Sequence, residues 1–425
     1  MRAKKNLLWV GVVAVLVGSS ACHSDPYDED TYEKLINYMS PVDSVDQRHT
    51  WSLTTTATFR FMATGNYGAK QVAVFTANPV TDTSAERIVE SSISDGQTLN
   101  LMMSYPSRLK ELYAALIDGS SRYTVVKFSV SQTNVTFDDP AEIQETITRT
   151  IPQQAYTYLF EEDFPQAGDY DYNDLVLRIS QRRTDTKQLT ISVTIAAVGG
   201  DYQMAGGIRL VGYRAVDIDT VYTKTGVSFN DGIPSGSLYL FDKTDLLVEG
   251  RNREAVINLF VDAHWAMAFN AGVNYGLFQR KKYNVSSSTG DNYQLRSTRT
   301  LDYVIEFKKD TGLDGFTLDM LDPFIITEYN GGIWETHLDG YKDAQVLYPY
   351  TTPKIKVLPW ALKVPKSDFA YPLEGNEIGF RKKMESGNVA MFGAYVEPGH
   401  SFGEWVEDYT KCLDWYLYPT LTYVY

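Results

Sequence analysis

A short acidic stretch near the middle of the chain carries the residues best suited to chemistry. Asp169, Asp171 and Asn173 alternate along it, and Asp174 follows directly. Side chains with oxygen donors this close together converge only when the backbone curls, and their like charges then repel unless a cation lies among them. Calcium accepts about six to eight oxygen ligands from flexible loops, whereas magnesium demands a stricter octahedron. The spacing therefore favours calcium, and a metal-free turn held by Asx side chains is the alternative.

This stretch is not an EF-hand loop, because such a loop needs glycine at its sixth position and glutamate at its twelfth. Asp174 and Ser180 stand there instead. Further ligands must come from elsewhere, and the nearest acidic pair precedes the stretch by a few residues. The apolar run at 175–179 predicts a strand that fixes one side of the loop. The predicted metal ligands are Glu161, Glu162, Asp169, Asp171, Asn173 and Asp174.

A second candidate site lies further along the chain. Glu335 and His337 are two positions apart, so on a strand both face the same side and could reach a metal or another ligand. A metal site would need a third ligand, which the sequence does not identify. Trp334 follows a glycine turn, and core packing of its indole is expected, with presentation to a sugar from a loop tip as the alternative. Trp334, Glu335 and His337 are therefore candidate ligand-binding residues.

Recognisable catalytic motifs are missing from the sequence. It contains no Gly-x-Ser-x-Gly elbow, no His-Glu-x-x-His helix and no phosphate-binding loop. A glycosidase needs only two carboxylates, and 53 acidic residues leave that alternative open. We expect a protein without catalytic activity, with a hydrolase as the less favoured alternative.

The overall composition is that of a folded acidic protein. Its 425 residues are 44% hydrophobic and 22% charged, and the formal net charge is −14. An acidic balance argues against nucleic-acid binding, because phosphates need a basic surface. Only two cysteines are present, which excludes a disulfide scaffold.

The first residues form a targeting segment. Basic residues at positions 2, 4 and 5 precede an apolar run at 7–17, which is too short to span a membrane comfortably. The small residues before Cys22 resemble a bacterial lipoprotein cleavage box. This resemblance implies a lipoprotein signal peptide over 1–21 and a mature chain held to outer-membrane lipid by acylated Cys22. An ordinary signal peptide with an incidental cysteine is the alternative.

Residues 22–48 form an acidic tether. The run Asp25–Asp30 directly after the lipidated cysteine resembles the surface-export signal of Bacteroidetes lipoproteins. It implies an outer-membrane lipoprotein exposed on the cell surface. A plain solvated tether is the alternative, and it leaves a periplasm-facing orientation open.

From His49 onward the pattern predicts a mainly β protein. Residues 49–150 are expected to form a small N-terminal immunoglobulin-like β-sandwich. Its predicted strands lie at 54–61, 71–76, 98–103 and 123–131. The segment 107–116 suits either a helix, by its leucine spacing, or a strand. The acidic stretch 138–152, closed by proline, marks the boundary of this domain.

Residues 151–425 are expected to form a larger β-sandwich-like domain. Its predicted strands lie at 175–179, 189–197, 208–213, 256–260, 301–307 and 324–326. The segment 389–392 is ambiguous. Residues 401–412 predict a short C-terminal helix, because Phe402, Trp405 and Val406 share one face and Ser401 can cap its start.

Several motifs of this larger region together resemble one family. They are the acidic run at 159–177, Asp262–Met267, Asp322–Ile325, Glu335–Tyr341 and Phe402–Trp405. The set resembles the LruC domain family, also called DUF4842, whose members are mostly lipoproteins of Bacteroidetes and other Gram-negative bacteria. The similarity spans about residues 156–420. It departs from the family at Glu162, where the family more often has aspartate.

The resemblance implies a β-sandwich-like fold, a capacity for calcium binding and no established enzymatic activity. Together with the targeting segment, it leads us to expect a non-catalytic outer-membrane surface lipoprotein whose β-domain is stabilised by calcium. Its role would be adhesion, or binding of a cell-surface, matrix or glycan ligand. The alternative is a carbohydrate-binding lipoprotein of a glycan-uptake system.

Overall fold

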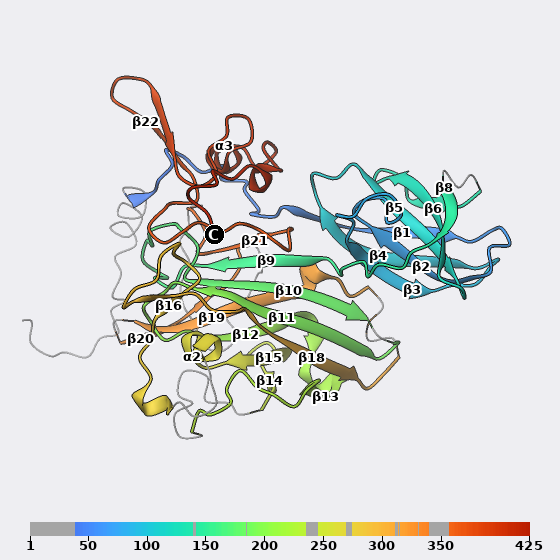
Figure 1. Cartoon of the computed structure of the whole chain (residues 1–425), viewed down its shortest axis with the longest axis horizontal. Coiled ribbons are helices and arrows are strands. Elements are labelled where there is room, and N and C mark those ends of the chain that lie inside the picture. The colour runs from blue at the N-terminus through green and yellow to red at the C-terminus, as the bar shows by residue number, and fades with distance from the viewer. Residues whose placement is uncertain are drawn as a thin grey trace, which may run out of the picture.

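The computed structural model describes residues 39–138, 142–183, 185–234, 245–268, 274–310, 313, 315–329, 331–339 and 357–425. The expected signal peptide 1–21, Cys22 and most of the expected tether 22–48 lie outside these ranges. Two β-rich parts follow one another along the chain and lie side by side (Figure 1). Within the described ranges, no helix is long and apolar enough to cross a membrane.

The first part is a sandwich of two sheets. Its strands are β1 (Thr54–Met62), β2 (Ala69–Phe75), β3 (Arg87–Ser92), β4 (Thr98–Pro106), β5 (Glu111–Asp118), β6 (Arg122–Ser129), β7 (Asn134–Thr136) and β8 (Glu142–Thr146). One sheet has the order β4-β1-β7 and the other the order β3-β2-β5-β6-β8. Strands β3 and β4 are therefore edge strands of their respective sheets.

The core of this sandwich follows from the alternation of side chains along its strands. Phe59 and Phe61 of β1 point inward and pack on Phe128 of β6. The segment 107–116, left open between helix and strand, contributes strand β5. Leu112 and Leu116 of β5 enter the same core, so the two-residue period of a strand prevails over the helical spacing.

The second part is built on a large mixed sheet. Its strands are β9 (Ala155–Phe160), β10 (Leu175–Arg183), β11 (Gln188–Val198), β13 (Ile218–Thr223), β16 (Lys282–Tyr283), β17 (Tyr293–Gln294), β18 (Arg299–Phe307) and β21 (Ala361–Val364). The main path runs β13-β18-β11-β10-β9-β21, and β16 pairs with β11 and β17.

A second sheet packs against this one. It has the order β14-β15-β12-β19-β20. Its strands are β12 (Ala205–Arg214), β14 (Leu247–Glu249), β15 (Glu254–Phe260), β19 (Leu321–Tyr329) and β20 (Gly332–Thr336). Short helices fill the corners: α2 (Ala263–Ala268), η1 (Ala215–Asp217), η3 (Tyr275–Leu277) and η4 (Leu318–Met320). The mainly β architecture expected from the sequence is confirmed.

The large sheet is covered on both faces, which makes this part three layers deep. On one face Tyr158, Leu177 and Ile191 join the core shared with the second sheet. On the other face Leu159 and Val176 meet the C-terminal region. That region contains the hairpin β22 (Phe380–Lys383) and β23 (Val389–Phe392), the helix α3 (Phe402–Glu407) and the turn η5 (Trp415–Leu417).

The C-terminal helix is shorter than the 401–412 expected. Ser401 caps it as anticipated, since its Oγ accepts a hydrogen bond from the Glu404 amide at 3.2 Å. Glu404 returns the contact by accepting from the Ser401 hydroxyl, which completes a capping box. The helix stops at Glu407 because Asp408 has an extended backbone.

The segment that enters the first sandwich does not extend freely into solvent. Val42, within the expected tether 22–48, is buried and bridges to Arg381 of β22. His49 stacks on Trp51, and its Nε2 donates to the Trp405 carbonyl oxygen at 3.0 Å. From Val42 onward, the chain therefore packs on the second part of the protein before it forms β1.

Polar contacts join the two parts. Asp319 of η4 accepts hydrogen bonds from the Thr54 and Thr56 hydroxyls of β1 at 2.8 and 2.7 Å. The same carboxylate accepts from Lys363 Nζ of β21 at 2.5 Å. At the end of β10, Arg182 forms an ion pair with Glu90 of β3. The two sandwiches are thus fixed to one another at several points.

Candidate metal centre

The acidic loop connects two neighbouring strands of the large sheet. Phe160 ends β9 and pairs with Leu175, the first residue of β10, so residues 161–174 leave and re-enter the sheet at the same place. Glu161 is anchored at the start of this loop, where its amide donates to the Trp360 carbonyl oxygen. The strands thereby hold both ends of a long connection, and its carboxylates fold back over the sheet end.

Three of the six predicted ligands meet. One carboxylate oxygen from each of Glu161, Asp169 and Asp171 lies within 4.8 Å of the others. Glu161 and Asp171 are buried, whereas Asp169 is exposed. The cluster is therefore buried at Glu161 and Asp171 and open to solvent at Asp169. A cation could enter from the open side.

Backbone amides hold the two buried carboxylates in place. The Tyr172 amide donates to Glu161 Oε1 at 2.6 Å, and the Tyr170 amide lies 3.3 Å from Oε2. Both tyrosines have a left-handed backbone, with φ of 60° and 55°, which turns their amides toward the same carboxylate. Asp171 in turn accepts from the Asn173 amide and from the Gly375 amide, at 3.1 and 2.9 Å.

The other three predicted ligands have different contacts. Glu162 accepts from the Asp201 and Tyr202 amides at the turn after β11. Asp174 accepts from the Glu162 amide at 2.7 Å and so closes the base of the loop. Asn173 donates through Nδ2 to the Pro372 carbonyl oxygen. These residues shape the loop around the three converging carboxylates.

Glycines make room for the acidic side chains. A Cβ atom on Gly168 would stand 1.9 Å from Glu161 Oε2, and one on Gly200 would stand 2.2 Å from Glu162 Oε2. Gly199 leaves the same kind of space for Asn173 Oδ1, at 2.0 Å. The carboxylates and the amide thus occupy volume that a side chain at these positions would fill.

The electrostatics of the cluster are unfavourable for a protein without a cation. Burial, with repulsion from Asp169 and Asp171, raises the pKa of Glu161 well above its ordinary value. Burial and the charge of Asp169 likewise raise the pKa of Asp171. None of the ion pairs seen within the described ranges includes Glu161, Asp169 or Asp171. A divalent cation would stabilise the ionised carboxylates and so lower their pKa values.

The donor set suits a hard cation. All three converging groups are carboxylates, the ligands that calcium and magnesium prefer over nitrogen or sulfur. Asn173 Oδ1 is fully buried and has no hydrogen-bond partner among the described residues, so one further oxygen remains unsatisfied in the same loop. An irregular loop that also offers backbone oxygens fits calcium better than the strict octahedron of magnesium. The residues therefore fit calcium.

The second group of candidates lies elsewhere, on the smaller sheet. Trp334 is on strand β20 instead of a loop tip, and its half-buried indole packs against Phe164 with ring centroids 6.2 Å apart. Glu335 is completely buried and its Oε2 lies 3.1 Å from His337 Nε2. The expected proximity of Glu335 and His337 is thus present, but in the interior.

A buried charge network surrounds this histidine. His337 Nδ1 lies 2.9 Å from Asp322 Oδ2, and Arg209 Nε donates to the same oxygen at 2.9 Å. Arg209 also pairs with Glu254 at 3.0 Å. Asp322 and Arg209 were not among the predicted site residues. The sequence could have indicated them, because each is a charged residue at a core-facing position of an otherwise apolar strand.

Comparison with known proteins gives one family. The family described as "Domain of unknown function (DUF4842)" matches residues 185–381, a little under half of the chain. The match includes the Asp262–Met267, Asp322–Ile325 and Glu335–Tyr341 motifs, and it begins after the acidic loop. No curated protein matches the chain.

One solved structure is similar to the chain in outline. It is described as that of a candidate lipoprotein from Bacteroides ovatus, with 15% identity and a TM-score of 0.48, covering 84% of this chain and 99% of the other. Likeness at this level carries no conclusion about function. Residues 185–381 therefore match the DUF4842 family, the family that the sequence motifs resemble.

Proposed function

We propose that this protein is a non-catalytic, lipid-anchored binding protein of the outer membrane whose larger β-domain is stabilised by calcium. The observation that carries the proposal is the convergence of Glu161, Asp169 and Asp171 within 4.8 Å at one end of the large sheet. Calcium at this point would tie the loop between β9 and β10 to the turn that contains Gly375. Its role is structural, since the buried carboxylates are held by backbone amides.

The anchoring part of the proposal rests on the sequence. The basic residues, the apolar run and the small residues before Cys22 support lipidation of that cysteine. The acidic run that follows supports export to the cell surface, where adhesion to another cell, a matrix protein or a glycan would be the use of the β-domains. The family description names no activity, and the binding role is therefore our own proposal.

Calcium dependence is tested with the chain from His23 onward. A cation that binds only the folded state stabilises it by about 2.7 kcal/mol at a concentration 100 times its dissociation constant. We expect the melting temperature in millimolar calcium to exceed that in EDTA for the native sequence. We expect no difference for Asp171→Asn, while Asp217→Asn, a matched change at an exposed aspartate, keeps the calcium response.

Two results would contradict the calcium site. One is an identical melting temperature in EDTA and calcium together with no calcium detected by elemental analysis. The other is a calcium response that Asp171→Asn leaves intact, because the bound cation would then lie elsewhere on this acidic protein.

Anchoring is tested in cells with Cys22→Ser. We expect the native protein in the membrane fraction, labelled by a fatty-acid probe and accessible to a protease added outside intact cells. The variant should lose the lipid label and leave the membrane, and adhesion of the cells to a coated surface should fall to the level of a deletion strain. Retention of label and membrane association by Cys22→Ser would refute the lipid anchor.

A further inference from the structure

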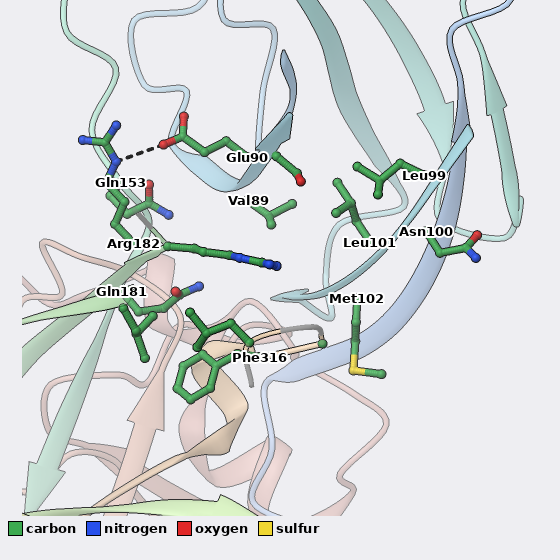
Figure 2. A pocket seen from close by; sticks show the side chains of 15 residues that line it. Val89, Glu90, Leu99, Asn100, Leu101, Met102, Gln153, Gln181, Arg182 and Phe316 are labelled. Atoms are coloured by element: carbon green, nitrogen blue, oxygen red, sulfur yellow. Dashed lines mark hydrogen bonds and ion pairs between the residues drawn. The ribbon is translucent and has the colours of Figure 1, made fainter. Parts of the chain in front are cut away.

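A cleft of about 410 Å³ lies where the two sandwiches meet. Figure 2 shows β3 and β4 of the first sandwich along one wall and the end of β10 with Phe316 along the other. Asn100 and Arg182 at its mouth are exposed, so the cleft opens to solvent. Its volume is within the range of about 300–1,000 Å³ that small-molecule sites occupy, and domain junctions are a common place for them.

A much smaller cavity continues the cleft inward. It has a volume of about 10 Å³ and shares the lining residues Val89, Met102, Gln181 and Phe316 with the cleft. Gln154 and Thr317 also line it. This is roughly the space that one water molecule or one hydroxyl oxygen needs. The inner cavity therefore accepts a single polar atom and no larger group.

Two polar side chains of the inner cavity have no hydrogen-bond partner among the described residues. Gln154 is 1% exposed and Thr317 is 2% exposed. Both side-chain atoms of the Gln154 amide and the Thr317 hydroxyl have no hydrogen-bond partner among the described residues. Buried amides and hydroxyls are nearly always hydrogen-bonded in folded proteins. Two such side chains around a space the size of one oxygen atom indicate that an oxygen binds between them.

The outer cleft indicates what kind of molecule carries that oxygen. Its polar lining includes the amides of Asn100, Gln153 and Gln181, and each primary amide both donates and accepts hydrogen bonds. Its charged side chains are Glu90, Arg182 and Arg183. Glu90 pairs with Arg182 and with Arg87, at 2.9 and 2.8 Å, and Arg183 Nε donates to the Asp185 carbonyl oxygen at 3.2 Å. These charged groups already have partners within the protein, which favours a neutral ligand over a highly charged one.

Apolar side chains complete the lining. Leu99 and Met102 of β4 are half-buried and face the cleft together with Leu101. A saccharide has hydroxyls that donate and accept, together with an apolar C–H face, and so matches both parts of this lining. An extended peptide would instead need a free strand edge, but the outer edge of β3 is already bonded at Arg87 to Pro152 and Gln154.

We propose that the cleft between the sandwiches binds a neutral saccharide, one hydroxyl of which enters the inner cavity between the Gln154 amide and the Thr317 hydroxyl. In the free protein one water can serve the same two groups. The site is separate from the calcium cluster and does not depend on metal. The inference deepens the proposed binding role, on which it rests. It supplies a ligand class for the cleft.

The probe is an array of neutral, sialylated and sulfated oligosaccharides presented to the chain from His23 onward. The neutral glycan that binds is then titrated calorimetrically into the native protein and the variants Gln154→Leu and Thr317→Val. We expect each variant to bind about tenfold more weakly, the effect of about one lost hydrogen bond. We also expect each variant to melt at the same or a higher temperature, because an unpartnered buried group has been removed.

Matched controls separate the cleft from general effects. Thr336→Val removes another buried hydroxyl that has no partner among the described residues, on β20 away from the cleft, and should leave binding unchanged. Asn100→Ala at the exposed rim cannot disturb the core and should weaken binding, so it carries the test if a buried variant fails to fold. Binding should persist in EDTA below the melting transition, which distinguishes this site from calcium.

Four outcomes would overturn the inference, and the first three concern the cleft itself. They are an array on which no neutral glycan binds, equal affinity of the native protein and all cleft variants, and a cleft that binds extended peptides but no glycan. A loss of binding in Thr336→Val equal to that in Thr317→Val would also refute it.

Discussion

His337 occupies an unusual position between two carboxylates that are shielded from water. Asp322 and Glu335 are both fully buried, and each lies within hydrogen-bond distance of one ring nitrogen. The Phe324 ring stacks on the imidazole at 4.6 Å. A ring that donates from both nitrogens is the protonated form, so the histidine contributes a positive charge that balances part of the buried negative charge.

This arrangement predicts a pH dependence. Burial acts to lower the pKa of His337, but the charges and hydrogen bonds of Asp322 and Glu335 outweigh it and raise the pKa above its ordinary value. The folded protein then keeps a proton that the unfolded chain releases near pH 6.5. The stabilisation is complete below about pH 6.5 and is lost as the pH rises through the raised pKa.

Urea unfolding at pH 5.5 and pH 8 measures this contribution. We expect His337→Leu to lose about 3–5 kcal/mol at the lower pH, since it removes the positive charge between Asp322 and Glu335 and leaves Arg209 as the cation that contacts Asp322. Its pH dependence over this interval should also be smaller than that of the native chain. His400→Leu, at a partly exposed pair with Asp414, is the control and should change stability by about 1 kcal/mol or less. Equal slopes for native protein and His337→Leu would contradict the assignment.

At the scale of elements, the acidic loop fits because neighbouring turns lack side chains. The turn after β11 places Gly199 and Gly200 under Asn173 and Glu162, and Gly168 lies under Glu161. The acidic side chains of the loop therefore pack against glycine backbone, which leaves the space that they occupy. Substitution of these glycines should damage the loop as surely as removal of its acids.

We expect Gly168→Ala to displace the Glu161 carboxylate, because the new methyl group would coincide with Oε2. Overpacking of this kind costs about 1–3 kcal/mol. The calcium-dependent rise in melting temperature should shrink or vanish at the same time. Gly290→Ala is the matched control, since nothing lies within 4 Å of a Cβ atom there and stability should be unchanged. A native calcium response in Gly168→Ala would show that Glu161 is dispensable.

Element prediction from sequence succeeded where side chains alternate. The strands at 54–61, 189–197 and 301–307 are confirmed with small shifts at their ends. Strand β9 was missed because both its faces are buried: Tyr158 enters one core and Leu159 the other, so its apolar run shows no period. Strand β20 was anticipated only in part: Glu335 was considered on a strand, whereas Trp334 was considered at a loop tip, because the pairing with β19 is a tertiary property.

The metal cluster could be predicted only in part, because some of the contacts that form it are also tertiary. The alternation of Asp169 and Asp171 is local and visible in the sequence. The Gly375 amide that fixes Asp171 is 204 positions away, and no local pattern reveals it. Glu162 has the expected residue type but is drawn to the turn after β11 by two amides there.

At the scale of the whole molecule, one carboxylate joins the two sandwiches. Asp319 accepts from Thr54 and Thr56 of the first and from Lys363 of the second. Removing it leaves the largely buried Lys363 ammonium without its counter-charge. The relative position of the two parts, and with it the cleft between them, should depend on this contact.

Calorimetric scans of Asp319→Ala test this dependence. We expect the variant to lose cooperativity between the sandwiches, so that one unfolding transition separates into two, with a loss of up to about 3–5 kcal/mol from the broken pair. Asp310→Ala, at an exposed pair with Lys187, should leave the scan unchanged. A single, undisplaced transition in Asp319→Ala would show that the remaining contacts, among them the Arg182–Glu90 ion pair, couple the parts without Asp319.

The bridge from Val42 to Arg381 and the packing of Trp51 on Trp405 determine how mechanical load would travel. Tension applied at the amino-terminal end meets the C-terminal region of the larger domain first. The small sandwich follows that attachment along the chain, so tension between the amino-terminal end and the larger domain does not pass through it. A load between the amino-terminal end and the larger domain would pass through the hairpin β22–β23 and would bypass the small sandwich.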